Sequence, residues 1–188
     1  MREGRCGGRT TGDLYCSRGA NCSHPSCLRC RRASYSSDAK HAGSCWSSAT
    51  AMAVSHTCDD ADRTWARTLL QSIGIVVDID EAMLDAFTGL IGSGPAYLFY
   101  VAESLQAAAV DEGFDEATSA KLVAQLLVGA AALLDREPQH ARELRQRVTS
   151  PNGTTAAGVA ALNDRKTHDA FVAAVRAATQ RSKELGDA

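Results

Sequence analysis

From Asp80 onward, apolar residues recur with the three-to-four-residue spacing of an α-helix, and alanine and leucine dominate the apolar positions. Aromatic residues make up only 5% of the chain, although 45% of it is hydrophobic. That composition favours closely packed helices of small residues over a β-sandwich. We therefore expect residues 80–188 to be nearly all helical, with helices over about 80–90, 93–112, 116–136, 138–148, from 154, and 167–185.

The segment 116–136 is rich in alanine and leucine on nearly all sides. Its apolar stripe consists of Leu122, Leu126, Ala130 and Leu133. A helix that is apolar all round is buried, either in the centre of a domain or against another subunit. The segments 93–112 and 116–136 carry more apolar surface than a monomer of this size covers, so we expect a homodimer or a larger homo-oligomer.

Residues 49–79 have a different pattern, which predicts a strand, a helix and a second strand. Residues 49–55 suit a strand, and acidic residues around Asp59 suit a helix start. Gly74 ends that helix, and the apolar run Ile75–Ile79 suits a buried strand. A strand, a helix and a second strand in this order suit one unit of an α/β domain.

Residues 1–48 show neither the alternation of a strand nor the apolar stripe of a helix, so we expect an irregular segment. All seven cysteines lie in the first 58 residues. Cys27 and Cys30 form one Cys-x-x-Cys pair, but a structural zinc site needs a second well-spaced pair. Disorder is the expectation for this segment, with zinc as the alternative, and we assign no metal site.

The stretch Val148–Gly158 lies between a basic helical segment and an alanine-rich one. Within it, Pro151 fixes φ, and Asn152 and Gly153 are residues that readily take positive φ. Thr154 and Thr155 then begin a helix, whose first N–H groups lack partners inside the helix. One interpretation is an ordinary turn with a threonine cap. The other is an anion-binding site made by converging backbone donors.

Two motifs together resemble pyrroline-5-carboxylate reductase, the last enzyme of proline synthesis. Ser93-Gly94-Pro95-Ala96-Tyr97 matches the end of a Ser-Gly-Ser-Gly-Pro-Ala-Tyr segment, and 148–155 matches Val-x-Ser-Pro-Gly-Gly-Thr-Thr, with Asn152 in place of a glycine. The resemblance runs from about residue 49 onward. It implies a mainly α fold, in which a helical dimerisation domain like the C-terminal part of 6-phosphogluconate dehydrogenase follows a remnant of a Rossmann domain.

The resemblance also implies an activity, the transfer of a hydride from NADPH or NADH to 1-pyrroline-5-carboxylate, which gives L-proline. The substrate-binding residues would be Ser150, Gly153, Thr154 and Thr155, with Thr155 as the catalytic candidate at the imine nitrogen. Glu137 aligns with an acid near the substrate amine, although a solvated carboxylate is the alternative. Arg147 lies near the cofactor in the family, and otherwise belongs to a solvated helical face.

A Gly-x-Gly-x-x-Gly turn, which would hold a dinucleotide, occurs nowhere in the sequence. Read one base out of frame, allowed codons for residues 38–47 spell Met-Pro-Asn-Thr-Pro-Ala-Leu-Val-Gly, which resembles the family segment upstream of this point. We therefore interpret residues 1–48 as a hypothetical out-of-frame translation of the nucleotide-binding domain. Sequencing the gene through this region tests the hypothesis, and a single frame without that alternative reading contradicts it.

Charge and hydropathy limit which partners and which cellular location we expect for the chain. The net charge is −2 and the pI about 6.2, so no nucleic-acid surface is expected. The apolar run Leu122–Leu134 is too short to span a bilayer, and the first residues lack a signal core, so we expect a cytoplasmic protein without a membrane partner. The alternative function is a non-catalytic helical dimerisation module with a cysteine-rich leader.

Overall fold

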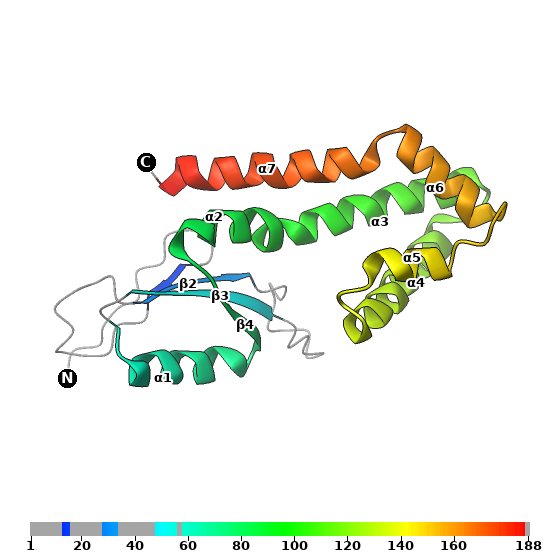
Figure 1. The fold of residues 1–188 in the computed structure, drawn as a ribbon. Helices are drawn as coiled ribbons and strands as arrows, with labels where there is room; N and C mark the ends of the chain where they lie inside the picture. The colour runs from blue at the N-terminus through cyan, green and yellow to red at the C-terminus, as the bar shows by residue number, and fades with distance from the viewer. Residues whose placement is uncertain (1–12, 16–27, 34–47, 56–57, 187–188) are drawn as a thin grey trace. The chain divides into compact units, whose positions relative to one another are not determined.

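The computed structural model describes residues 13–15, 28–33, 48–55 and 58–186, and the first two of these ranges by their backbone alone (Figure 1). The described chain divides into two compact units. One combines the residues up to Pro95 with those from Val175 onward, and the other is Ala96–Ala174.

The first unit contains a four-stranded sheet in the order β1-β2-β3-β4. Strands β3 (Ser48–Val54) and β4 (Gly74–Asp78) are parallel, and α1 (Asp60–Gln71) connects them. The side chain of Asp59 accepts a hydrogen bond from the N–H of Asp62 at 2.7 Å and so caps α1. The strand–helix–strand unit predicted from the sequence is therefore confirmed.

Two further strands lie where the sequence pattern predicts none. β1 (Asp13–Tyr15) and β2 (Leu28–Ala33) extend the sheet beyond β3, and each pairs antiparallel with its neighbour. The expectation of an irregular segment is wrong for these two stretches. Their backbone groups pair with the open edge of a neighbouring strand, and such pairing does not require polar and apolar side chains to alternate. The other residues of 1–47, with the Cys-x-x-Cys pair's side chains, lie outside the described residues.

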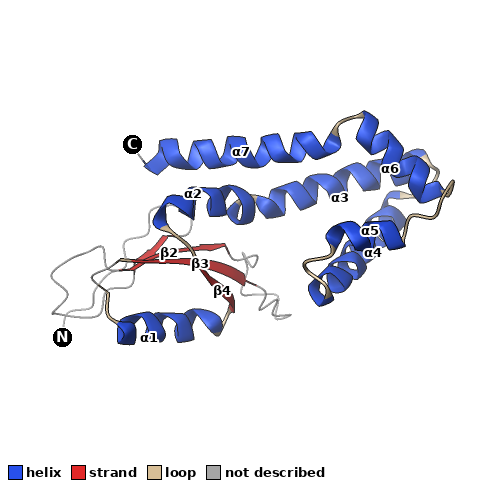
Figure 2. Ribbon diagram, viewed as in Figure 1, coloured by secondary structure: helices blue, strands red, loops and turns tan. Residues whose placement is uncertain are grey.

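Strand β3 carries core residues on both faces of the sheet, and Figure 2 shows helices on either side of it. Met52 packs against Ala66 and Leu70 of α1. On the other face, Ala51 and Ala53 pack against Leu84. A strand buried on both faces explains why its sequence, SATAMAV, does not alternate between polar and apolar residues.

Residues 81–92 form three consecutive helical turns of different kinds instead of the single helix predicted for 80–90. A 3₁₀ turn, η1 (Glu81–Met83), leads into α2 (Leu84–Phe87) and then into a π-helical turn, η2 (Thr88–Gly92). The C-terminal part of α7 (Thr167–Gly186) packs here, since the Ser182 hydroxyl donates to the Asp85 carboxylate at 2.7 Å. Gly89 lies directly against Thr179.

The remaining helices agree closely with the sequence pattern. They are α3 (Gly94–Asp111), α4 (Glu116–Arg136), α5 (Ala141–Arg147) and α6 (Thr154–Asp164). Gly113 follows α3 with a φ of 99°, and Asp115 caps α4 by accepting from the Thr118 N–H at 2.9 Å. Only α5 differs in its start. It begins at Ala141 and not at Pro138, because residues 137–140 form a turn in which the N–H of His140 donates to the Glu137 carbonyl oxygen at 3.0 Å.

Helices α3 and α4 expose much of their apolar surface. No residue of α3 is buried, and Phe99 on it is 71% exposed. On α4 only Ser119 and Val123 are buried, whereas Leu126 and Leu133 of the predicted stripe are 57% and 51% exposed. The stripe is thus the uncovered face of α4 in a single chain.

By length and composition alone, α4 is also long and apolar enough to cross a membrane. This is weak evidence for a membrane span, because core helices of soluble proteins pass the same test.

The close approach at Gly89 gives a stability prediction. A Cβ atom at this position would lie 2.7 Å from the Thr179 backbone nitrogen and 3.0 Å from its Cα. We expect Gly89→Ala to lower the free energy of unfolding by about 1–3 kcal/mol, measured by urea denaturation. Gly92→Ala is the matched control, since its Cβ would only reach the Thr88 methyl group at 3.4 Å. Equal losses in the two variants would contradict the steric argument.

Candidate functional site

The segment Ser150–Gly153 forms a tight turn at the start of α6. The N–H of Gly153 donates to the carbonyl oxygen of Ser150 at 3.1 Å, and Pro151 occupies the second position of the turn. Asn152 occupies the third position with a φ of 59°. Proline followed by a residue with positive φ is the signature of a type II turn. Asparagine in place of the family's glycine therefore keeps the positive φ, as predicted.

Gly153 itself does not take positive φ, and here the sequence interpretation is wrong. Its φ is −81° and its ψ 171°, and it is the N-cap of α6. A Cβ atom at Gly153 would lie 2.3 Å from the Ser150 hydroxyl oxygen and 3.2 Å from the Ser150 carbonyl oxygen. A glycine is thus favoured here by the close approach of Ser150 and not by a left-handed backbone.

The first turn of α6 presents backbone donors to solvent. The N–H of Ala157 donates to the Gly153 carbonyl at 3.2 Å, which is the first bond of the helix. Within the part of the chain that the structure describes, no acceptor engages the N–H groups of Thr154, Thr155 and Ala156, and no side chain caps the helix. The predicted capping by threonine hydroxyls is therefore not found. Three unpaired donors at a positive helix end suit a carboxylate.

Glu137 and Arg147, the two more distant candidates, are bonded to each other. Nη1 of Arg147 donates to Oε1 of Glu137 at 2.9 Å, and Nη2 donates to Oε2 at 2.9 Å. The side chains are 40% and 57% exposed, respectively. Two parallel N–H···O bonds between a guanidinium and a carboxylate make the most directional of ion pairs. Both side chains are therefore exposed to solvent, as the alternative interpretation of each expects, but they are paired with each other.

The pair changes the acid–base properties of both residues. The hydrogen bond from Arg147 lowers the pKa of Glu137 from its ordinary 4.5, against the opposing effect of desolvation. The same bond raises the pKa of Arg147. Glu137 is accordingly ionised at neutral pH, and its charge is already matched by a cation.

All the predicted site residues lie in the second compact unit. Ser150, Gly153, Thr154 and Thr155 share one turn and the helix start that follows it, while the Glu137–Arg147 pair connects the end of α4 with the end of α5. Thr149 was not singled out by sequence. Its hydroxyl donates to the Arg145 carbonyl oxygen at 2.6 Å. The sequence could have indicated this bond, because Thr149 stands four residues after Arg145 at the end of a helix, and threonine hydroxyls commonly bond to the carbonyl four residues earlier.

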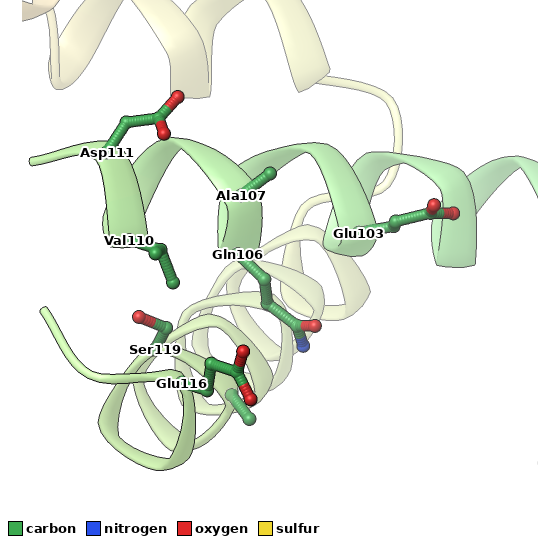
Figure 3. A pocket seen from close by; sticks show the side chains of 8 residues that line it. Glu103, Gln106, Ala107, Val110, Asp111, Glu116 and Ser119 are labelled. Atoms are coloured by element: carbon green, nitrogen blue, oxygen red, sulfur yellow. The ribbon is translucent and has the colours of Figure 1, made fainter.

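A second feature of this unit is an open hollow of about 560 Å³ between α3 and α4 (Figure 3). Its lining contains none of the candidate site residues and consists of Glu103, Gln106, Ala107, Val110, Asp111, Glu116, Ser119 and Ala120. Among the described residues, no group of three or more His, Cys, Asp or Glu side chains is arranged to hold a metal ion.

Comparison with known proteins shows which class of protein this chain belongs to. Residues 81–185 match the family described as pyrroline-5-carboxylate reductase dimerisation. Pyrroline-5-carboxylate reductase 1 of Bacillus subtilis is 40% identical over 140 residues, which are 74% of this chain and 47% of that protein. The Synechocystis enzyme is 39% identical over 137 residues, 73% of this chain and 51% of that protein. The chain belongs to the pyrroline-5-carboxylate reductase family.

Solved structures agree with this assignment. A pyrroline-5-carboxylate reductase from Coxiella burnetii superposes with a TM-score of 0.76 at 32% identity, covering 84% of this chain and 56% of that one. The Plasmodium falciparum pyrroline carboxylate reductase, solved with NADP bound, has a TM-score of 0.68 at 28% identity, covering 75% and 54%. The chain spans about half the length of the relatives that it matches.

The Glu137–Arg147 pair predicts a specific response to acid. Since the pKa of Glu137 is lowered in the folded state, its contribution to stability is present above the ordinary pKa of 4.5 and is lost as the pH falls through the folded value. We expect Arg147→Ala to return the pKa of Glu137 towards its ordinary value, measured from the ¹³C shift of its carboxyl group. Glu184 is the internal control, because its pKa is lowered by Arg181 and should not move. An unchanged Glu137 pKa in the variant would show that Arg147 is not the cause.

Proposed function

We propose that this chain provides the substrate-binding loop and the dimerisation domain of an NAD(P)H-dependent reductase that converts 1-pyrroline-5-carboxylate into L-proline. The observation that carries the proposal is the turn Ser150–Gly153, which leaves three backbone donors free at the start of α6 in a chain of this family. The cytoplasmic location and the domain limits at residues 48 and 79 stay predictions.

The substrate has one fixed handle, its carboxylate, and a reactive imine carbon. The N–H groups at the start of α6 would hold the carboxylate, since the helix end is positive and the amides are already oriented. The exposed hydroxyl of Thr155 on the first turn would contact the imine nitrogen. A protonated imine is electrophilic without further help, so the protein's task is mainly to bind and orient.

The cofactor of the proposed reaction is NADPH or NADH, which supplies the hydride. The Plasmodium relative with bound NADP supports this choice. The sequence does not include the Gly-x-Gly-x-x-Gly turn that holds a pyrophosphate. Arg147, the candidate for cofactor contact, donates one hydrogen bond from each of Nη1 and Nη2 to Glu137. We therefore assign no step of the reaction to cofactor-binding residues of this chain.

A second copy of the chain is the proposed partner. The exposed apolar side chains of α3 and α4 need cover, and the family match is to a dimerisation domain. Burial of such side chains between two copies would stabilise both helices by about 25 cal/mol for each Å² of apolar surface removed from water. A non-catalytic dimerisation module is the alternative, and the missing glycine-rich turn is the observation that favours it.

The proposed substrate loop is tested by titration with L-proline, followed through the amide resonances of Thr154 and Thr155. We expect weak binding, on the order of millimolar, because the loop provides only part of a pocket. Thr155→Ala should weaken binding about fivefold, the value of one hydrogen bond of about 1 kcal/mol. Thr155→Ser keeps the hydroxyl and is the matched control. Amide resonances that do not move with proline would contradict the proposed site.

Activity is tested with a fusion in which residues 49–188 follow the intact nucleotide-binding half of a relative. The fusion should oxidise NADPH in the presence of 1-pyrroline-5-carboxylate. If it folds, dimerises and binds NADPH without consuming the substrate, the non-catalytic alternative is supported.

The dimer is tested by sedimentation of the full chain. We expect a dimer or a larger species, and Leu126→Glu on α4 should shift the equilibrium towards the monomer, since a charge would then lie in an apolar interface. Leu185→Glu is the matched control, because Leu185 is similarly exposed but lies on α7. A wild-type chain that sediments as a monomer at high concentration contradicts the proposal.

A further inference from the structure

Glu137 and Arg147 form one ion pair, although the resemblance implies a contact with the substrate for Glu137 and with the cofactor for Arg147. Two hydrogen bonds of 2.9 Å each join Arg147 to Glu137. In this geometry the pair uses both oxygens of the carboxylate and both terminal nitrogens of the guanidinium.

The pair closes the hairpin between α4 and α5. Glu137 is the C-cap residue of α4, and Arg147 is the last residue of α5. Helix α5 has only seven residues and buries none of them. So short a helix is not stable by itself, and it depends on what fastens its two ends. At its start, the N–H of His140 donates to the Glu137 carbonyl oxygen at 3.0 Å. At its end, the fastening is the bond from Arg147 to the Glu137 side chain.

The end of α5 is connected to the candidate loop by a short and well-bonded segment. Only Val148 and Thr149 separate Arg147 from Ser150. The N–H of Thr149 donates to the Gln146 carbonyl at 3.0 Å, and its hydroxyl donates to the Arg145 carbonyl at 2.6 Å. A displacement of the end of α5 is therefore passed directly to the Ser150–Gly153 turn.

We propose that Glu137 and Arg147 are positioning residues, which act as a pair to hold the Ser150–Thr155 loop in its binding geometry. This inference rests on the proposed function, since it assigns a purpose to the loop. It differs from the roles that the resemblance implies, because neither side chain needs to touch a ligand. A loop that is in the competent geometry for only a fraction of the time binds more weakly by that fraction.

Exchanging the charges of Glu137 and Arg147 in the full chain distinguishes positioning of the loop from direct contact with the ligand. Glu137→Arg and Arg147→Glu each place like charges together, whereas the double variant restores an opposite pair in reversed order. We expect each single variant to weaken L-proline binding roughly threefold to tenfold, and the double variant to recover most of that loss. If the side chains instead contact the ligand with their own charges, the double variant would bind as poorly as the single ones or worse, and the proposal would be wrong.

A second measurement does not depend on any ligand. The N–H of Gly153 is held by the Ser150 carbonyl, so its hydrogen exchange reports whether the turn is formed. We expect faster exchange at Gly153 in both single variants and recovery in the double variant. Unchanged exchange in the single variants overturns the proposal, even where proline binding falls.

The control pair is Arg181 and Glu184 on α7, an exposed ion pair at 2.9 Å between residues three apart on one helix. Exchanging these two charges should change neither proline binding nor Gly153 exchange. If the wild-type chain does not bind proline at all, the proposed function fails, and the Gly153 exchange rates still decide whether the pair positions the loop.

Discussion

Apolar helices that a single chain leaves uncovered are the constraint on which the rest of the structure depends. Isolated helices gain most of their stability from tertiary packing of an apolar face. In this chain α3 buries no residue and α4 buries only two. The candidate loop Ser150–Thr155 follows α4 after the short helix α5. The proposed dimer and the proposed substrate binding would therefore both depend on the burial of α4.

The fold was largely predictable where the pattern is local. Capping by Asp59 and Asp115 and the apolar spacing gave α1 and α4 nearly to the residue. The stripe of α4 was also found, but periodicity alone does not say whether a stripe faces the same chain or another one. Strands β1 and β2 were not predictable, because they pair through backbone groups with a distant strand. The end of α4 before Glu137 follows from the proline at position 138, whereas the late start of α5 depends on the turn between the two helices.

The site shows a similar division. Asn152 could be given a positive φ from its residue type and from the proline before it. Gly153 was expected to take positive φ and does not, and its close approach to Ser150 could not be predicted because it depends on the folded turn. The Glu137–Arg147 pair joins residues ten apart across a helix break. Its geometry depends on how that break turns the chain, which neither propensity nor spacing determines.

The two compact units differ in whether they are built from one continuous segment of the chain. The helical unit, Ala96–Ala174, is continuous, whereas the unit with the sheet is completed by residues from Val175 onward, through Thr179 and Ser182. During synthesis, domains generally fold from the N-terminus as they emerge. Here the sheet unit cannot be completed until α7 has been translated. The middle of the chain is therefore free to fold before its beginning, and a ribosome that stops after Ala174 leaves the sheet unit unfinished and the helical unit complete.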